Sequence, residues 1–162
     1  MFGTRRSDVG WLTLRLAVGL TLAAHGFPKL FGGPGRTAPK ALARTLGPNY
    51  QAAVERSGPQ AFARALEGMG VPQPKAAAYM SGIAELGGGL ALAAGLATGI
   101  SATVVVVNMA VAVATAHWKN GFYGQGGFEF PLLLGAGAVA IGVAGPGRLS
   151  MDALLEADRR LG

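Results

Sequence analysis

Apolar residues are gathered into four long runs along the chain, and most polar residues lie between these runs. The runs cover residues 9–27, 75–96, 99–117 and 128–144. Each approaches the roughly 20 residues that a helix needs to cross about 30 Å of hydrocarbon. None alternates as a strand does, and helices satisfy their own backbone polar groups in lipid. The pattern therefore predicts an all-α fold, an integral membrane bundle of four helices.

The connections between the runs are very unequal. The short segment 97–99, whose last residue opens the third run, joins the second and third runs, which predicts an antiparallel hairpin. Residues 28–74 form a long polar loop outside the membrane, in which we expect helices at 39–46 and 59–68. Phe62, Ala65, Leu66 and Met69 are expected to share the apolar face of the second of these helices. Residues 1–162 are thus predicted to form a single transmembrane domain.

Composition agrees with a membrane location and excludes some chemistry. The chain is 51% hydrophobic and 14% charged, whereas soluble domains carry about 25% charged residues. It has no cysteine, which excludes a thiolate metal site and thiol redox chemistry by this chain itself. Its net charge of +6 comes without a basic run interleaved with aromatics, so anionic lipid is the expected partner and nucleic acid is not.

Polar residues inside the apolar runs are the candidate functional positions, because inserting a charge into a membrane costs about 2.5–3.5 kcal/mol. Arg15 lies in the first run and Glu85 near the middle of the second. We expect these two to pair, either as a structural clamp or as part of a polar site. Asn108, in the third run, is expected to support this interior by bonding between helices.

Chain direction predicts a second group of polar residues at one face of the membrane. The first and third runs cross in the same direction, so His25 and His117 end them at the same face. Glu129 opens the fourth run at this face, and Lys29 follows the first run there. His25, His117 and Glu129 are therefore candidate catalytic residues for proton transfer, or ligands for a metal. Ordinary interfacial hydrogen bonding is the alternative for each histidine.

An ordered set of short motifs adds a family resemblance. The motifs are RLAVG at 15–19, HGFPKL at 25–30, ELGGGL at 85–90, GGFEF at 126–130 and GPGRLSMD at 145–152. In this order they resemble the DoxX family of small bacterial membrane proteins. The family takes its name from relatives of a membrane subunit of thiosulfate:quinone oxidoreductase. Some actinobacterial relatives are associated with a membrane complex that counters oxidative stress. The resemblance implies a bacterial cytoplasmic membrane and cytoplasmic termini.

These observations lead to a functional hypothesis with alternatives. The chain is expected to be a membrane subunit of a redox complex, in which His25, His117 and Glu129 handle protons or polarise a bound quinone. Without cysteine or a flavin or nicotinamide motif, a partner subunit has to supply the electrons. The tight Ala- and Gly-rich bundle argues against a haem. The alternatives are a non-enzymatic scaffold or chaperone and a small-solute carrier, with other subunits or further copies of the chain as partners.

Overall fold

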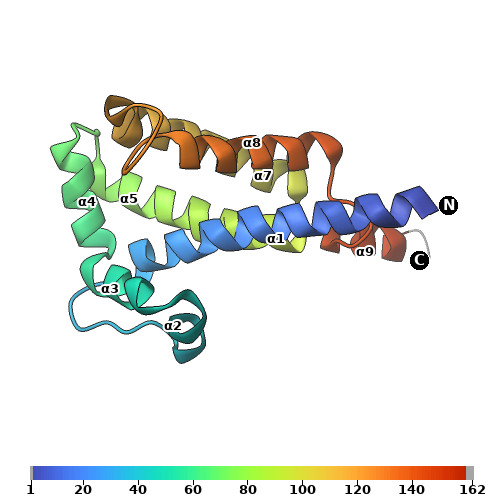
Figure 1. Cartoon of the computed structure of the whole chain (residues 1–162), viewed down its shortest axis with the longest axis horizontal. Coiled ribbons are helices and arrows are strands. Elements are labelled where there is room, and N and C mark those ends of the chain that lie inside the picture. The colour runs from blue at the N-terminus through green and yellow to red at the C-terminus, as the bar shows by residue number, and fades with distance from the viewer. Residues whose placement is uncertain (1, 160–162) are drawn as a thin grey trace. The chain divides into compact units, whose positions relative to one another are not determined.

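Helices make up all the regular secondary structure of residues 2–159, the part of the chain that the structure, a computed structural model, describes (Figure 1). The all-α prediction is therefore confirmed. Two elements, η1 and η2, are single π-helical turns, and η3 is a 3-10 turn. In chain order the elements are α1 Phe2–Phe31, α2 Lys40–Leu46, α3 Pro48–Arg56, α4 Pro59–Gly68, α5 Pro74–Ile83, η1 Ala84–Gly88, α6 Gly89–Ala94, α7 Thr98–Ala112, η2 Val113–His117, η3 Trp118–Asn120, α8 Glu129–Ala144 and α9 Met151–Arg159.

The chain forms two compact units. The first unit comprises the described residues up to Ala23 and those from Gly87 onward, and the second unit comprises Ala24–Leu86. The boundaries fall inside α1 and inside η1. Each unit has its own apolar core, so each can be described by its own contacts.

The core of the first unit is shared by α1, α6, α7 and α8. Small residues bring two of these helices into close contact: a Cβ added to Gly19 of α1 would lie only 2.7 Å from the backbone nitrogen of Ala93 in α6. Glycine and alanine allow such approach of backbones, as in helices that associate in lipid. The buried core residues are Val18, Leu22, Leu92, Ala102, Val105, Met109, Leu134, Ala138 and Ile141.

A tight turn joins α6 to α7. The amide of Leu96 donates to the carbonyl of Ala91 at 2.9 Å, and the amide of Gly95 donates to that of Leu92 at 3.1 Å. This is a Schellman ending, in which Gly95 has φ +66°, a conformation that glycine adopts without steric cost. The connection therefore occupies residues 95–97 instead of the expected 97–99. α7 and α8, which follow, pack side by side (Figure 1).

The second unit holds the long loop, and it is more helical than predicted. The helices expected at 39–46 and 59–68 are confirmed as α2 and α4. The prediction missed α3, although Pro48 stands at its first turn and Tyr50 and Val54, one turn apart, are buried. Of the residues predicted to share the apolar face of α4, Leu66 is buried and Ala65 and Met69 are exposed, and Ala63 is buried as well.

The first apolar run ends at residue 27, just before Pro28, but the first helix continues beyond this proline. α1 contains Pro28 and continues to Phe31. A proline inside a helix lacks its own amide donor, but its carbonyl still accepts. Here the amide of Gly32 donates to the Pro28 carbonyl at 2.9 Å, which lets the helix run on past the proline. Lys29 therefore lies within the last turn of α1 and not in the loop.

Two helical stretches are long and apolar enough to cross a membrane. They are Arg6–Phe31 and Thr98–Asn120, and Glu129–Ala144 is a shorter apolar helix. Large apolar side chains also cover outer faces in the first unit. Ile100, Val104, Val107 and Val111 are exposed at helical spacing along α7. An outer helix face of a soluble protein is normally polar, so this face is typical of contact with lipid.

Candidate functional site

A buried ion pair lies at the end of α1 in the second unit. Lys29 Nζ donates to Glu85 Oε1 at 2.6 Å, and Lys29 Nζ also lies 4.6 Å from the centre of the Phe62 ring. The Glu85 residue is 4% exposed, whereas the Lys29 side chain is 24% exposed. The ammonium group therefore connects a nearly dry carboxylate to the surface, and the aromatic ring adds a cation–π contact.

His25 belongs to the same group of residues. It precedes Lys29 by one helical turn on the same face of α1. Its ring interacts electrostatically with both Glu85 and Lys29, and its side chain is exposed at the surface of the second unit. The structure thus brings together three sequence-predicted residues, His25, Lys29 and Glu85, in a combination that the sequence analysis did not foresee. We refer to them as the His–Lys–Glu cluster.

The backbone at Glu85 is unusual in a way that bears on function. Glu85 lies in the π-helical turn η1, which continues α5 into α6. Gly26 of α1 lies against this turn, since a Cβ added to Gly26 would be 2.9 Å from the Cβ of Glu85. Close contact between the two backbones brings Glu85 within reach of Lys29. π-turns inside α-helices are frequent at functional sites.

His117 occupies the second π-turn, η2, in the first unit. Its Nδ1 lies 2.8 Å from the carbonyl oxygen of Gly126. A carbonyl only accepts, so Nδ1 carries a hydrogen and the neutral ring presents Nε2 as its acceptor. Asn120 Nδ2 donates to the same carbonyl at 2.9 Å. The loop between η3 and α8 therefore sets the orientation of the imidazole.

Glu129, the third predicted catalytic residue, is held by the same loop. Its Oε1 accepts from the backbone amide of Gly124 at 3.3 Å. His117 and Glu129 are thus connected through the 121–128 segment, while His25 belongs to the second unit. The arrangement of all three at one membrane face stays a prediction. Within residues 2–159, no three His, Cys, Asp or Glu side chains are grouped so that they could hold a metal ion.

Arg15 is buried in the first unit, with only 1% of its surface exposed. Its Nη2 donates to the backbone carbonyl of Leu149. The guanidinium group also occupies the space beside Gly95, where a Cβ would collide with it and with Ser150. Arg15 therefore connects α1 to the turn after α6 and to the segment before α9.

Asp152 forms a second group of polar residues together with Arg15, in the first unit. The sequence analysis did not identify Asp152 as a functional position. Its carboxylate accepts from the amides of Ala97 and Thr98 at 2.7 and 2.9 Å, and from the Thr98 hydroxyl at 2.7 Å. It thereby caps the first turn of α7 from a distant part of the sequence. The only available signal was the aspartate in the exit motif at 145–152, whose partner the sequence does not reveal.

The surroundings of Asp152 favour its charged form. Burial by itself would raise the pKa of Asp152, but the hydrogen bonds from Thr98 and Ala97 and the charge of Arg15 outweigh burial and hold the pKa below its ordinary value. The charge of Arg15 acts on Asp152 within the first unit, and Glu85 pairs with Lys29 within the second unit. The expected pairing of Arg15 with Glu85 stays a prediction. Asn108 lies half-buried on α7, and its supporting role stays a prediction.

Comparison with known proteins gives one finding. Residues 10–118, more than half of the chain, match the model of the DoxX family. The match includes Arg15, the His–Lys–Glu cluster and His117, and it ends before Glu129 and Asp152. No curated protein and no solved structure matches the chain. With a match of this extent, the chain belongs to the DoxX family, which indicates a membrane protein.

Proposed function

We propose that this chain is a four-span protein of the bacterial cytoplasmic membrane that binds a quinone beside the His–Lys–Glu cluster, as a subunit of a redox complex. The observation that carries the proposal is the ion pair between the buried Glu85 and Lys29, whose helix α1 also carries His25 and is long enough to span a membrane. Charged groups inside membrane segments are expensive and are typical of functional sites. Redox association is the role that the family resemblance implies.

The membrane location in this proposal is supported by the apolar side chains that α1 and α8 expose. Large apolar side chains form outer stripes on α1 at Val9, Leu16 and Leu20, and on α8 at Leu132, Leu133, Val139 and Val143. Val143 is 84% exposed. Exposed apolar stripes on several helices are unfavourable in water and favourable in hydrocarbon. The continuous helical stretch of α5, η1 and α6 and the shorter α8 would provide the second and fourth spans.

The chemistry suits a quinone because its reduction to a quinol consumes two electrons and two protons. The Lys29 ammonium group can donate a hydrogen bond to one quinone carbonyl and transfer a proton to the oxygen of that carbonyl on reduction, and His25 can pass the second proton from water to the other carbonyl oxygen. Glu85 holds Lys29 in place and stabilises its charge. Water at the membrane surface replaces the protons. The electrons come from a partner subunit, since a chain without cysteine has no thiol to supply them.

His117 and Glu129 are proposed to add acid–base groups on the same side of the membrane. In a four-span topology the ends of α1 and α7 lie at one face, together with the start of α8. The hydrogen bond from Nδ1 to Gly126 leaves Nε2 of His117 available as a proton acceptor. With cytoplasmic termini, this face is the outer one.

Quinone content tests the proposal directly. The protein is extracted with its native lipids, and bound ubiquinone and menaquinone are quantified per mole of protein. His25→Ala and Lys29→Gln are expected to lower the quinone content several-fold. Lys119→Gln removes an exposed lysine near His117 and is expected to leave the quinone content unchanged.

The yield and melting temperature of each variant show whether it is folded. Quinone content that is equal in His25→Ala and wild type would refute binding at the cluster. A wild-type protein that carries no quinone but copurifies with stoichiometric protein partners would instead support the alternative function, a non-enzymatic membrane scaffold.

A further inference from the structure

A groove with only basic charges lies in the second unit. It is a cavity of about 1090 Å³ lined by the end of α1, the segment that follows it, and α4. Three of its lining residues are basic, Arg36, Lys40 and Arg64, and none is acidic. We call this the basic groove. Its charge predicts an anionic occupant.

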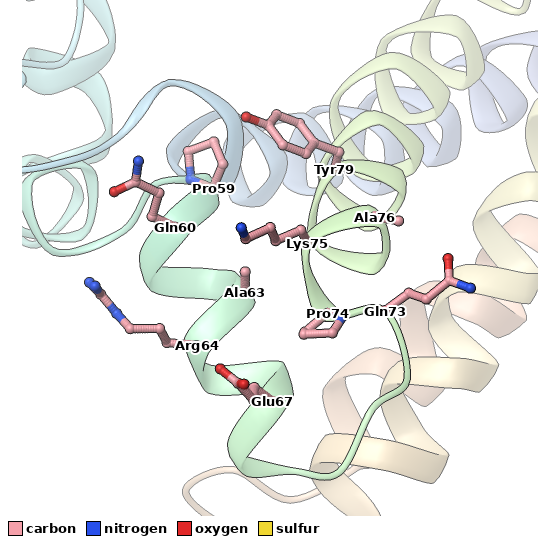
Figure 2. Close-up of a pocket in the computed structure, with 10 residues that line it drawn as sticks. All are labelled: Pro59, Gln60, Ala63, Arg64, Glu67, Gln73, Pro74, Lys75, Ala76 and Tyr79. Carbon is pink, nitrogen blue, oxygen red and sulfur yellow. The ribbon is translucent and has the colours of Figure 1, made fainter.

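The basic groove continues into a smaller pocket between α4 and α5. This pocket has a volume of about 730 Å³, and both cavities share Pro59, Gln60, Arg64 and Tyr79 in their walls. Figure 2 shows Lys75 extending from α5 toward α4 in the pocket. Glu67 also lines it, so the charge there is mixed. The basic groove is therefore the better place for an anion.

The basic side chains of the groove are available for binding. Arg36, Lys40 and Arg64 are exposed. The one ion pair among the described residues is that of Lys29 and Glu85, which leaves these three cations without an acidic partner there. Three like charges around one cavity repel each other, and a bound anion would relieve this repulsion.

An exposed apolar stripe begins where the groove ends. Tyr79 lines both cavities, and Met80 and Ile83 follow it on the outer face of α5 with exposures of 71% and 59%. Phe31, which also lines the basic groove, is exposed at the end of α1. A ligand that filled the groove and the stripe together would need an anionic end and an apolar end.

We propose that the basic groove binds an anionic phospholipid of the surrounding bilayer. Arg36, Lys40 and Arg64 hold the phosphate of its headgroup, and an acyl chain lies along Tyr79, Met80 and Ile83. Tyrosine at this junction suits the membrane interface, where an apolar ring meets polar headgroups, and basic pockets beside membrane helices are suited to lipid phosphates. The site rests on the membrane location proposed above and is independent of quinone binding.

Native mass spectrometry of the full chain tests this site. The protein is released from neutral detergent micelles that contain equal amounts of phosphatidylglycerol and phosphatidylcholine. Wild type is expected to retain one phosphatidylglycerol in preference to phosphatidylcholine. The double variant Arg36→Gln/Arg64→Gln is expected to bind it about tenfold more weakly, because each basic residue near an anionic lipid contributes several-fold to the affinity.

The matched control is Arg44→Gln/Arg56→Gln, which removes the same charge from the same loop outside both cavities. It is expected to bind like wild type. Equal losses in the two double variants would show general charge attraction and refute the site. Equal retention of the two lipids by wild type, or displacement of the lipid by millimolar inorganic phosphate, would also overturn it. Quinone content is measured in the same samples, so failure of one proposal is distinguishable from failure of the other.

Discussion

Lys29 and Glu85 differ in how far water reaches them, and this difference determines what each substitution does. Glu85 is 4% exposed and pairs with Lys29, whereas the Lys29 side chain is 24% exposed and keeps contact with solvent. Removing one partner of a buried pair leaves an uncompensated charge, which is more harmful than removing both. The pair therefore makes a clear case for a double-mutant cycle.

Lys29→Met is expected to lower the free energy of unfolding by about 2–3 kcal/mol, because it leaves Glu85 charged and buried. Glu85→Gln in the Lys29→Met background is expected to restore part of this loss, since the glutamine is neutral. The measurement is reversible unfolding in mixed micelles for wild type, both single variants and the double variant. Additive losses in the cycle would contradict a coupled pair.

Asp152 acts on stability through its protonation. Its pKa is lowered in the folded state, and that of an unfolded aspartate is about 3.9. Between these values the unfolded chain binds more protons than the folded chain, so stability rises with pH. The contribution of Asp152 to the free energy of unfolding is complete above the pKa of Asp152 in the unfolded chain. It is lost as the pH falls through the pKa of Asp152 in the folded chain.

Asp152→Asn is expected to lower the free energy of unfolding near neutral pH by about 1–2 kcal/mol, the usual contribution of a helix cap. It should also reduce the loss of stability that wild type shows below about pH 4. Denaturant unfolding at a series of pH values measures both effects. Glu156→Gln, an exposed position on the same helix, is the control. An acid dependence identical in Asp152→Asn and wild type would exclude this role.

At the scale of elements, the close contact between α1 and α6 depends on glycine, which has no side chain. A Cβ at Gly19 would lie 2.7 and 2.8 Å from the backbone nitrogen and Cβ of Ala93. A helix backbone cannot move away from such a collision without disturbing the core around it. Gly10, nine residues earlier in α1, has nothing within 4 Å of its added Cβ.

Gly19→Ala is therefore expected to destabilise the protein by about 1–3 kcal/mol through overpacking. Gly10→Ala, in the same helix, is expected to be neutral or stabilising by up to about 1 kcal/mol, because alanine has the higher helix propensity. The two melting temperatures, compared in the same detergent, check this. A similar shift in both variants would mean that helix propensity, and not the contact with α6, determines the effect of Gly19.

At the scale of the whole molecule, the proposed four-span topology predicts which parts of the chain face each side of the membrane. With no native cysteine, single introduced cysteines report position without background. In intact cells a membrane-impermeant maleimide is expected to label Arg44→Cys and Tyr123→Cys. Leu154→Cys is expected to react only after permeabilisation, because the termini are proposed to be cytoplasmic. These three residues are exposed in the structure.

Each outcome separates a different part of the topology. Labelling of Arg44→Cys and Tyr123→Cys on opposite sides of the membrane would refute the four-span arrangement. Labelling of Leu154→Cys alone in intact cells would keep four spans and reverse their orientation. Reaction of all three cysteines in a protein that is removed by alkaline washing would refute membrane integration altogether.

The sequence by itself determined the helical fold and the position of most helices. The run 99–117 has the length and apolarity of a membrane helix and the run 128–144 is apolar but shorter, and these properties depend only on local residues. The same holds for α4, which begins at Pro59 where a proline fits a first helical turn. Family membership was also readable, because ordered short motifs need no geometry.

Only the tertiary structure decided which polar groups are partners. Lys29 pairs with Glu85 in the second unit and the charge of Arg15 acts on Asp152 in the first unit, two interactions that the sequence pattern did not predict, while the pairing of Arg15 with Glu85 stays a prediction. Two local features that the sequence pattern did not predict accompany the pair of Lys29 and Glu85: α1 continues through Pro28 with Lys29 in its last turn, and Glu85 lies in the π-turn η1. Which polar groups meet depends on the rotation of each helix about its axis and on the residue at which the helix ends. Hydrophobic patterns do not define helix ends to within one residue.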